Sequence, residues 1–495
     1  MNRGLIANII SNISFFVCGY AIHFFLGGFA SPANYGVVGT IITLLDFEYL
    51  FVSNGARQSI ARNLSSRRYD GRSLILRTMV VQAGIVAVFF LIDFAGAPLF
   101  GMMLHDRTIE RYFQYAAFLV PANGLYVVML GINDGLQRFG RSALMSTLYP
   151  IVKLGTIPLI ILLFPADPVL GLEIGYCSAM IVIIVLGCFL LAPVWPRIVA
   201  DGRGKPRISW HDAAHGTLSF SLFFIMASLV LSADTFVVKS VLPDAMAGYY
   251  TGAMNFGKTT YYLLQAFAVI LLPVSSRLIG QGRRAEALAK VRMLTTLAFA
   301  FVLPIAVIIS ASANDLLASF YSEHYTVAAP ALSCLALSSF FMGVTVMLNM
   351  LLNAEKDTRF SDILSLASLV VVVAAFIVAA RLGGIVAVAA SSMVSTFLTM
   401  SVSYVQVRRR FGDVMTVHTW AAIGVNVVLW AAMYGVESLL HTRWFILLAL
   451  VYLVMYVLYA GILFVTHVID IKGVVASFTQ HGTRVPAAAV QVKRA

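Results

Sequence analysis

Long apolar segments separated by short polar ones recur from one end of the chain to the other. Fourteen such segments can be distinguished, and about 20 apolar residues suffice for an α-helix to cross a bilayer core of about 30 Å. The segments are too long to be buried strands, and an open sheet would leave unpaired backbone groups in lipid. The pattern therefore predicts an all-α polytopic membrane protein with about 14 transmembrane helices. The expected spans are 5–30, 36–61, 74–99, 112–135, 142–164, 170–193, 213–241, 247–275, 291–313, 328–353, 361–381, 383–407, 414–440 and 444–470.

The composition excludes a water-soluble fold. Of the 495 residues, 60% are hydrophobic and 11% are charged, whereas a soluble domain carries about a quarter charged residues. The first apolar segment is too long for the hydrophobic region of a signal peptide, so we expect it to be retained. The four cysteines fall inside apolar segments without metal-ligand spacing, so neither a disulfide framework nor a metal site is indicated.

The formal net charge of +12 raises the question of a nucleic-acid ligand, but its distribution indicates membrane topology. When the loops are assigned alternately to two sides, one side holds 25 of the 34 Lys and Arg residues and the other holds four. Cytoplasmic loops are enriched in Lys and Arg, so we expect both termini in the cytoplasm. No basic patch is interleaved with aromatic residues on a soluble surface, and no nucleic-acid partner is expected.

The longest polar connection, residues 194–212, follows the sixth expected span, and a basic stretch follows the twelfth. The two groups of six spans resemble a repeat, because aligning Gly36 with Gly248 places Asp46 opposite Lys258. Six is even, so both groups cross the membrane in the same direction, which predicts a pseudo-twofold axis along the membrane normal and a path between two lobes. The expected regions are an N-lobe (1–193), a cytoplasmic linker (194–212), a C-lobe (213–407), two further helices (408–470) and a cytoplasmic tail (471–495).

Several segments carry a family resemblance. They are the turn S-P-x-x-Y-G at Ser31 to Gly36, the hairpin from Ala233 to Tyr249 that begins with an acid, GLQRFGR after the fourth span, LLPVSSRL before a basic loop and SEHYTVAAPALSCLALSSFFMG at the tenth span. With them the chain resembles the multidrug/oligosaccharidyl-lipid/polysaccharide exporter superfamily, and within it the polysaccharide transporter branch of Wzx-type flippases. The resemblance covers nearly the whole chain.

That resemblance implies a MATE/MurJ-like fold in the bacterial cytoplasmic (inner) membrane. It also implies a substrate, a polyprenyl-pyrophosphate-linked oligosaccharide that is moved across the membrane for assembly of O-antigen, capsule or exopolysaccharide. Drug-exporting relatives typically have twelve spans, so two additional spans favour the polysaccharide branch. A polysaccharide polymerase and export machinery are the partners that such a role implies.

Ionisable side chains deep in a membrane helix are costly unless they face protein or water, so they mark candidate functional positions. Polar residues of the eighth span recur at spacings of three and four and line one helical face. In the second span Asp46 and Arg57 share a face, whereas Glu48 points elsewhere. We predict a hydrated cavity whose cations bind a lipid pyrophosphate and acidic sugars, unless Arg57 instead extends to the aqueous interface. The predicted cavity residues are Lys258, Arg57, Lys153, Asn255, Tyr262, Gln265, Asn54 and Asn12.

Carboxylates inside such a cavity are candidates to bind a proton or a sodium ion and so couple transport to a gradient. Asp46, Glu48 and Asp234 are those candidates, and the sequence does not select the ion. The alternative is that the intramembrane charges only neutralise each other, Asp46 with Lys258 and Asp234 with Lys239.

No P-loop, catalytic carboxylate pair in a polar domain or His/Cys cluster is found in the sequence, so we expect neither an enzyme nor a cofactor. The sequence therefore predicts a flippase that works by alternating access. A cation-coupled exporter of drugs or other small molecules from the same superfamily is the first alternative. A membrane scaffold or polymerase partner, in which the intramembrane charges are dispensable, is the second.

Overall fold

A computed structural model of the chain describes residues 2–66, 68–201, 204–218, 222–355, 359–440 and 444–466. The described residues form helices and turns and contain no strand. Among them, ten helices are long and apolar enough to cross a membrane. The all-α, multispanning class predicted from the hydrophobic pattern is thus confirmed. The number fourteen is not fixed by these ten helices and stays a prediction.

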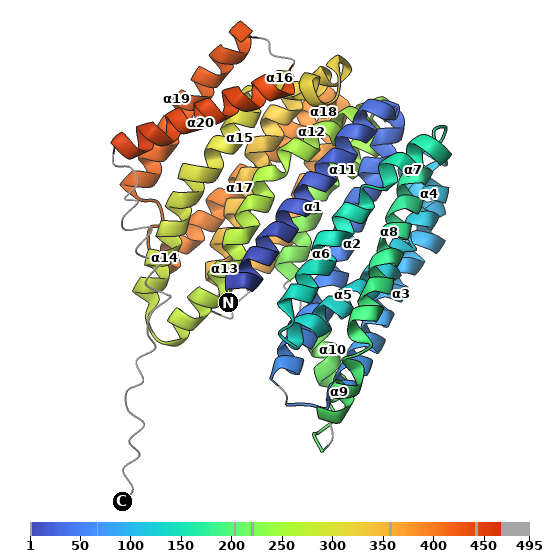
Figure 1. The fold of residues 1–495 in the computed structure, drawn as a ribbon. Coiled ribbons are helices and arrows are strands. Elements are labelled where there is room, and N and C mark those ends of the chain that lie inside the picture. The colour runs from blue at the N-terminus through green and yellow to red at the C-terminus, as the bar shows by residue number, and fades with distance from the viewer. Residues whose placement is uncertain are drawn as a thin grey trace, which may run out of the picture.

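The N-lobe occupies the right side of Figure 1, in blue to green. Side-chain caps fix where several of its helices begin. The Ser31 hydroxyl accepts a hydrogen bond from the Asn34 N–H at 3.2 Å, and Asp70 and Asp167 cap two later helices. The helices are α1 (Asn2–Phe29), α2 (Pro32–Ser65), α3 (Gly71–Met103), α4 (Ile109–Ala116), α5 (Leu119–Gly135), α6 (Phe139–Lys153), α7 (Thr156–Leu163) and α8 (Pro168–Leu191).

Two short helices follow in the predicted linker, α9 (Trp195–Asp201) and α10 (Trp210–Leu218), at the lower end of the N-lobe in Figure 1. A Cβ atom on Gly55 of α2 would lie 1.9 Å from the Thr217 carbonyl oxygen, so α10 packs directly on that helix. Residues 213–218, which we expected to open the C-lobe, therefore contact the N-lobe. The other region boundaries stay predictions.

The C-lobe lies on the left of Figure 1 and contains one long element that folds back on itself. Non-helical backbone angles at Gly383 and Gly384 divide α18, and Gly384 has a positive φ of 62°, which glycine adopts readily. Ser368 and Thr399 hydrogen-bond at 3.3 Å across the two arms, so the arms run side by side. The C-lobe helices are α11 (Leu222–Val241), α12 (Asp244–Gly257), α13 (Thr259–Gly280), α14 (Arg284–Leu297), η1 (Ala298–Val302), α15 (Leu303–Ala311), α16 (Ala313–Phe320), η2 (Glu323–Ala328), α17 (Ala329–Asn353) and α18 (Arg359–Phe411).

The last two helices, α19 (Val417–Leu440) and α20 (Phe445–Val465), attach to a π-helical turn, η1, in the C-lobe. A π-helical turn leaves backbone carbonyls without their regular helical partners. Asn426 of α19 donates a hydrogen bond to the Phe299 carbonyl at 3.1 Å, and Tyr456 of α20 donates one to the Phe301 carbonyl at 3.0 Å. Both helices are therefore fixed to the C-lobe through the irregular turn.

The two lobes meet where α2 and the loop 104–108 contact α11 and α12, and we call this contact the interlobe seam. A Cβ atom on Gly36 would lie 2.8 Å from the Gly248 backbone nitrogen, and one on Gly39 would overlap the Thr251 side chain. Only glycine permits such an approach of two backbones. The two glycines aligned in the predicted repeat thus face each other across the seam, as equivalent positions do when they lie close to a twofold axis.

Candidate functional site

Two lysines, one in each lobe, lie where a membrane helix is interrupted. Lys153 is the last residue of α6, three residues before α7 begins at Thr156, and Lys258 separates α12 from α13. Carbonyl groups at a helix C-terminus carry a partial negative charge that favours a nearby cation. Each lysine therefore lies at a short interruption between two consecutive helices.

Both lysines act on the same exposed carboxylate. Asp46 of α2 is exposed, and Lys258 and Lys153 both interact with it electrostatically. The same two lysines act on the half-buried His23 of α1. Since α1, α2 and α6 belong to the N-lobe and Lys258 to the C-lobe, both lobes contribute charged side chains to this group. We call Asp46, Lys153 and Lys258 the interlobe charge site.

The two amines of this site have no carboxylate of their own. Among the residues that the structure describes, neither Lys153 nor Lys258 forms an ion pair. The Lys153 Nζ instead lies 3.5 Å from the centroid of the Tyr176 ring, a cation–π contact. The direct Asp46–Lys258 ion pair that the sequence left open is not formed, so no carboxylate among the described residues neutralises either amine by direct contact.

Arg57 is placed differently from the two lysines. Its Nε donates a hydrogen bond to Asp134 Oδ2 at 2.8 Å, which joins α2 to α5 within the N-lobe. The arginine side chain is 38% exposed and the aspartate side chain 16% exposed. The guanidinium is thus accessible but already neutralised.

Asn255 is the centre of a hydrogen-bond network that joins the lobes. Its Nδ2 donates to the Tyr35 hydroxyl of α2 at 2.7 Å and to the Tyr321 hydroxyl at 3.2 Å. Its backbone carbonyl accepts a hydrogen bond from the Tyr20 hydroxyl of α1 at 3.0 Å. Asn255 therefore holds the seam together and is not a free polar group of the cavity face.

The other predicted cavity residues differ in how they are placed. Tyr262 is 36% exposed and its ring centroid lies 6.0 Å from that of Phe16 in the other lobe. Gln265 donates a hydrogen bond to the Tyr261 hydroxyl one turn earlier, at 2.9 Å. The side chains of Asn12 and Asn54 lie outside what the structure describes.

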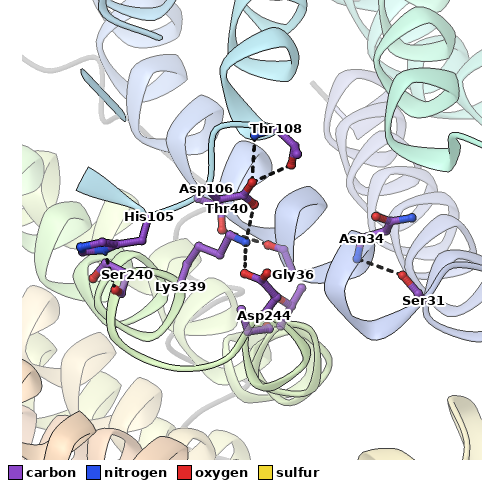
Figure 2. Close-up of polar contacts among 12 residues, drawn as sticks. Ser31, Asn34, Gly36, Thr40, His105, Asp106, Thr108, Lys239, Ser240 and Asp244 are labelled. Carbon is purple, nitrogen blue, oxygen red and sulfur yellow. Dashed lines mark hydrogen bonds and ion pairs between the residues drawn. The ribbon is translucent and has the colours of Figure 1, made fainter. Parts of the chain in front are cut away.

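A buried lysine closes the seam (Figure 2). The Lys239 side chain has no exposed surface, and its Nζ lies 2.7 Å from Asp106 Oδ2 and 2.5 Å from Asp244 Oδ1. Asp106 is in the N-lobe loop 104–108, so this ion pair crosses between the lobes. Burial alone would raise the pKa of Asp106, but the hydrogen bonds from Lys239 and Thr108 hold that pKa below its usual value.

Asp234 does not pair with Lys239, contrary to the neutralisation that the sequence left open. The buried Asp234 carboxylate accepts hydrogen bonds from the Tyr250 hydroxyl at 2.8 Å and from the Thr235 N–H at 2.7 Å. The three donors of an ammonium group must therefore be satisfied by other residues. Lys239 obtains its carboxylates from a distant loop and from the next helix, which sequence spacing cannot reveal.

Glu48 is buried inside the N-lobe rather than near the interlobe charge site. Its side chain is 1% exposed and faces Asp93 of α3, which is fully buried. The sequence prediction that Glu48 points away from the face of Asp46 agrees with this position. Asp93, Asp106 and Asp134 were not among the predicted site residues. Asp93 had a signal as an acid inside the expected span 74–99, and Asp134 directly precedes the segment GLQRFGR that carries the resemblance.

Comparisons with known proteins agree with this architecture. A family model described as "Polysaccharide biosynthesis protein" matches residues 25–330. No curated protein matches the chain. The fold is similar to that of the lipid II flippase MurJ in an inward closed conformation, with a TM-score of 0.66, 14% identity and coverage of 94% of this chain and 100% of that one.

Two structures of multidrug resistance MATE family transporters of the MOP superfamily, in different conformations, are also similar. The inward-facing structure gives a TM-score of 0.66 at 14% identity, covering 82% of this chain and 98% of that one. The outward-facing structure gives a TM-score of 0.61 at 16% identity, covering 82% of this chain and 94% of that one. The fold is thus that of a membrane transporter or flippase, and the family match spans most of the chain. The chain belongs to the family described as "Polysaccharide biosynthesis protein", and its fold is similar to that of MurJ and of MATE transporters.

Proposed function

We propose that this protein is a flippase that moves polyprenyl-pyrophosphate-linked oligosaccharides across the bacterial inner membrane by alternating access. The observation that carries the proposal is the interlobe charge site, in which two amines without ion pairs face one exposed carboxylate. A pyrophosphate presents several anionic oxygens, and charge-assisted hydrogen bonds to ammonium groups are its natural contacts. We place Lys258 and Lys153 ahead of Arg57 as ligands because Arg57 already pairs with Asp134.

The distribution of the amines suggests how binding follows the movement of the lobes. Lys153 belongs to the N-lobe and Lys258 to the C-lobe, so an anion held by both favours the conformation in which they are close. When the lobes part at the site, one amine withdraws and the affinity falls. A ligand shifts a conformational equilibrium only through such a difference in affinity.

The comparisons support the class of cargo without identifying it. The family match is to a polysaccharide biosynthesis protein, and one structural neighbour flips lipid II. The drug exporter is the competing function, because other neighbours are multidrug transporters. Asp46 and Asp234 are our candidates to bind a coupling ion near the interlobe charge site. A polymerase and export machinery would receive the flipped product, with both termini of the chain in the cytoplasm.

The decisive experiment compares a strain that lacks this gene with its complemented parent by mass spectrometry of polyprenyl-linked oligosaccharides. We expect completed repeat units to accumulate in the deletion strain, together with loss of external polysaccharide. Unchanged lipid-linked pools combined with altered drug sensitivity would contradict the flippase assignment and favour that of a multidrug exporter. Unchanged pools with lost polysaccharide would favour a scaffold or polymerase partner.

A further inference from the structure

Aromatic side chains from both lobes pack against one another beside the interlobe seam. Those of the N-lobe come from α1 and α2, and those of the C-lobe come from α12, η2 and the residue after α16. We call them the aromatic cluster, and its members are Tyr20, Phe24, Tyr35, Phe256, Tyr321 and Tyr325. Four of the six are tyrosines, and a tyrosine hydroxyl needs a hydrogen-bond partner when it is buried.

The ring contacts of this cluster cross between the lobes. The Phe24 and Phe256 rings are stacked with centroids 5.4 Å apart, and Tyr35 packs on Tyr321 at 5.8 Å. Tyr321 in turn stacks on Tyr325 at 4.8 Å within the C-lobe. When the lobes separate at the seam, the contacts between lobes are lost and each wall presents aromatic faces.

One hydroxyl group of the cluster has no partner in the closed seam. Tyr325 is 2% exposed, and its hydroxyl forms no hydrogen bond with any residue that the structure describes. A buried polar group without a partner is destabilising, so a phenylalanine would suit this closed packing better. The closed packing thus gives the Tyr325 hydroxyl no role, whereas a ligand in an open seam would supply its partner.

The other polar groups of the cluster are satisfied only while the seam is closed. The Asn255 amide donates to the Tyr35 hydroxyl at 2.7 Å and to the Tyr321 hydroxyl at 3.2 Å, and these two hydroxyl oxygens are 3.1 Å apart. Separation of the lobes takes Tyr35 away from both C-lobe partners. An open seam therefore presents ring faces edged with hydroxyl and amide groups.

This combination matches a sugar ring. A pyranose has apolar C–H faces, which pack on aromatic rings, and a rim of hydroxyl groups, which form hydrogen bonds with tyrosine and asparagine. An apolar drug or a lipid chain would use the ring faces but would leave the hydroxyl and amide groups without partners, which is unfavourable.

The cluster also lies where the sugars of the proposed cargo would be. Asn255 is three residues before Lys258, about 4.5 Å along the helix. The Tyr20 hydroxyl is 2.6 Å from Oγ1 of Thr259, the residue after Lys258. In the proposed cargo the first sugar is bonded directly to the pyrophosphate, so a pyrophosphate at Lys258 would bring that sugar next to the aromatic cluster.

We propose that the aromatic cluster is the binding surface for the sugar rings of the cargo in the conformation with an open seam. The identity of the cargo rests on the proposed function, whereas carbohydrate binding by the open seam can be measured on its own. In the closed conformation the rings of the two lobes occupy each other's faces and exclude the sugar. A sugar that binds only the open seam shifts the lobes toward that conformation.

The test uses purified full-length protein whose seam is held open. A Cβ atom on Gly248 would lie 1.8 Å from the Pro32 carbonyl oxygen, so Gly248→Val prevents the two backbones from closing. Gly39→Val, which would overlap Thr251, provides a second route to the same state. The probe is a set of repeat-unit-sized oligosaccharides from partial hydrolysis of the parent strain's external polysaccharide, and saturation-transfer NMR measures its binding. We expect at least tenfold tighter binding to both open variants than to the parent protein.

The role of the unpartnered hydroxyl is tested by Tyr325→Phe in the Gly248→Val background. We expect about tenfold weaker oligosaccharide binding, because a hydrogen bond to the sugar is lost. In the parent background the same change should leave the melting temperature unchanged or raise it. Tyr404→Phe is the matched control, because the Tyr404 hydroxyl donates to Asp413 Oδ1 at 2.9 Å on α18, outside the cluster, and its removal should leave binding unchanged.

Three results would overturn the proposal. They are the absence of oligosaccharide binding in both open variants, equal binding in Tyr325→Phe and Tyr404→Phe, and binding of the aromatic cation rhodamine 6G in place of the oligosaccharide. Any of these results, together with completed repeat units that accumulate in the deletion strain, would refute the sugar surface and leave the flippase assignment intact. Unchanged lipid-linked pools would refute the flippase assignment, whereas oligosaccharide binding that depends on Tyr325 would still support the sugar surface.

Discussion

Lys239 and Lys258 belong to the same helical hairpin, yet the tertiary structure gives them opposite surroundings. Lys239 has no exposed surface and contacts two carboxylates, one from each lobe. Lys258 is half-buried at a helix break and forms no ion pair with any described residue. A cation whose charge is fully satisfied holds parts of a protein together, whereas an accessible cation without a partner is free to bind. The comparison therefore separates the residue that closes the seam from the residue that we propose as a ligand of the cargo.

Replacing Lys239 by Met should have the largest effect on the closed seam. Asp106 and Asp244 would lose their shared cation, and breaking a buried ion pair costs about 3 kcal/mol or more. We expect a lower melting temperature and an opened seam. The readout is maleimide labelling of a Thr251→Cys reporter in a background without the native cysteines, because Thr251 is buried against Gly39 in the seam.

The control for this experiment is Arg111→Met. Arg111 pairs with Asp167 at 2.8 Å inside the N-lobe, so its loss should leave the reporter protected. A reporter that stays equally protected in Lys239→Met and in the parent would show that the buried ion pair does not keep the lobes together.

Replacing Lys258 by Ala should affect transport and leave stability nearly unchanged. A charge-assisted hydrogen bond contributes about 1.5–3 kcal/mol, so we expect roughly a tenfold or greater fall in polysaccharide output at equal protein level. The free energy of unfolding should change by less than about 1 kcal/mol, because no ion pair is broken. Lipid-linked oligosaccharides and external polysaccharide are measured together in the complemented deletion strain.

Lys290→Ala is the matched control, since Lys290 is a half-buried lysine on α14 away from the interlobe charge site. The double variant of Lys153 and Lys258 sharpens the comparison, because it removes both amines of that site. Full output from the double variant would exclude the interlobe charge site as the place where the pyrophosphate binds.

Replacing Asn255 by Ala should loosen the seam by less than the loss of Lys239. The Tyr35 and Tyr321 hydroxyls would lose the amide that now donates to them, which costs about 1–2 kcal/mol. Labelling of the Thr251→Cys reporter should be intermediate between the parent and Lys239→Met. Gln265→Ala is the control, because its hydrogen bond to Tyr261 stays within one helix. Equal labelling in Asn255→Ala and Gln265→Ala would show that Asn255 does not stabilise the seam.

Of these four changes, acidification should have the smallest effect on the seam near neutral pH. The hydrogen bonds from Lys239 and Thr108 keep the pKa of Asp106 lowered, so the ion pair contributes its full stability above the usual carboxyl pKa of about 4. That contribution is lost as the pH falls through the lowered pKa. The melting temperature should therefore be constant near neutral pH and fall only in strong acid, and Asp106→Asn should reduce that fall. A response centred near neutral pH in the parent would point to another group.

The hydrophobic pattern and the spacing of polar residues predicted much of this molecule. They predicted the all-α membrane class, a repeat in which Gly36 aligns with Gly248, and Lys258, Lys153 and Asp46 as candidate site residues. In the structure the two glycines are in contact and both lysines act on Asp46. These features follow from local rules, because segment length decides whether a helix can span lipid and helical periodicity decides which residues share a face.

Which charged residues pair with each other depended on the tertiary structure. Arg57 is paired with Asp134, 77 positions away, and Lys239 is paired with Asp106, 133 positions away, rather than with the nearby Asp234. Glu48 meets Asp93 because α2 packs against α3 in one particular rotation. Periodicity along one helix places a residue on a face but does not specify which residue of another helix will lie opposite. The sequence therefore determined which charges enter the membrane, and the packing of the helices decided which of them form ion pairs and which do not.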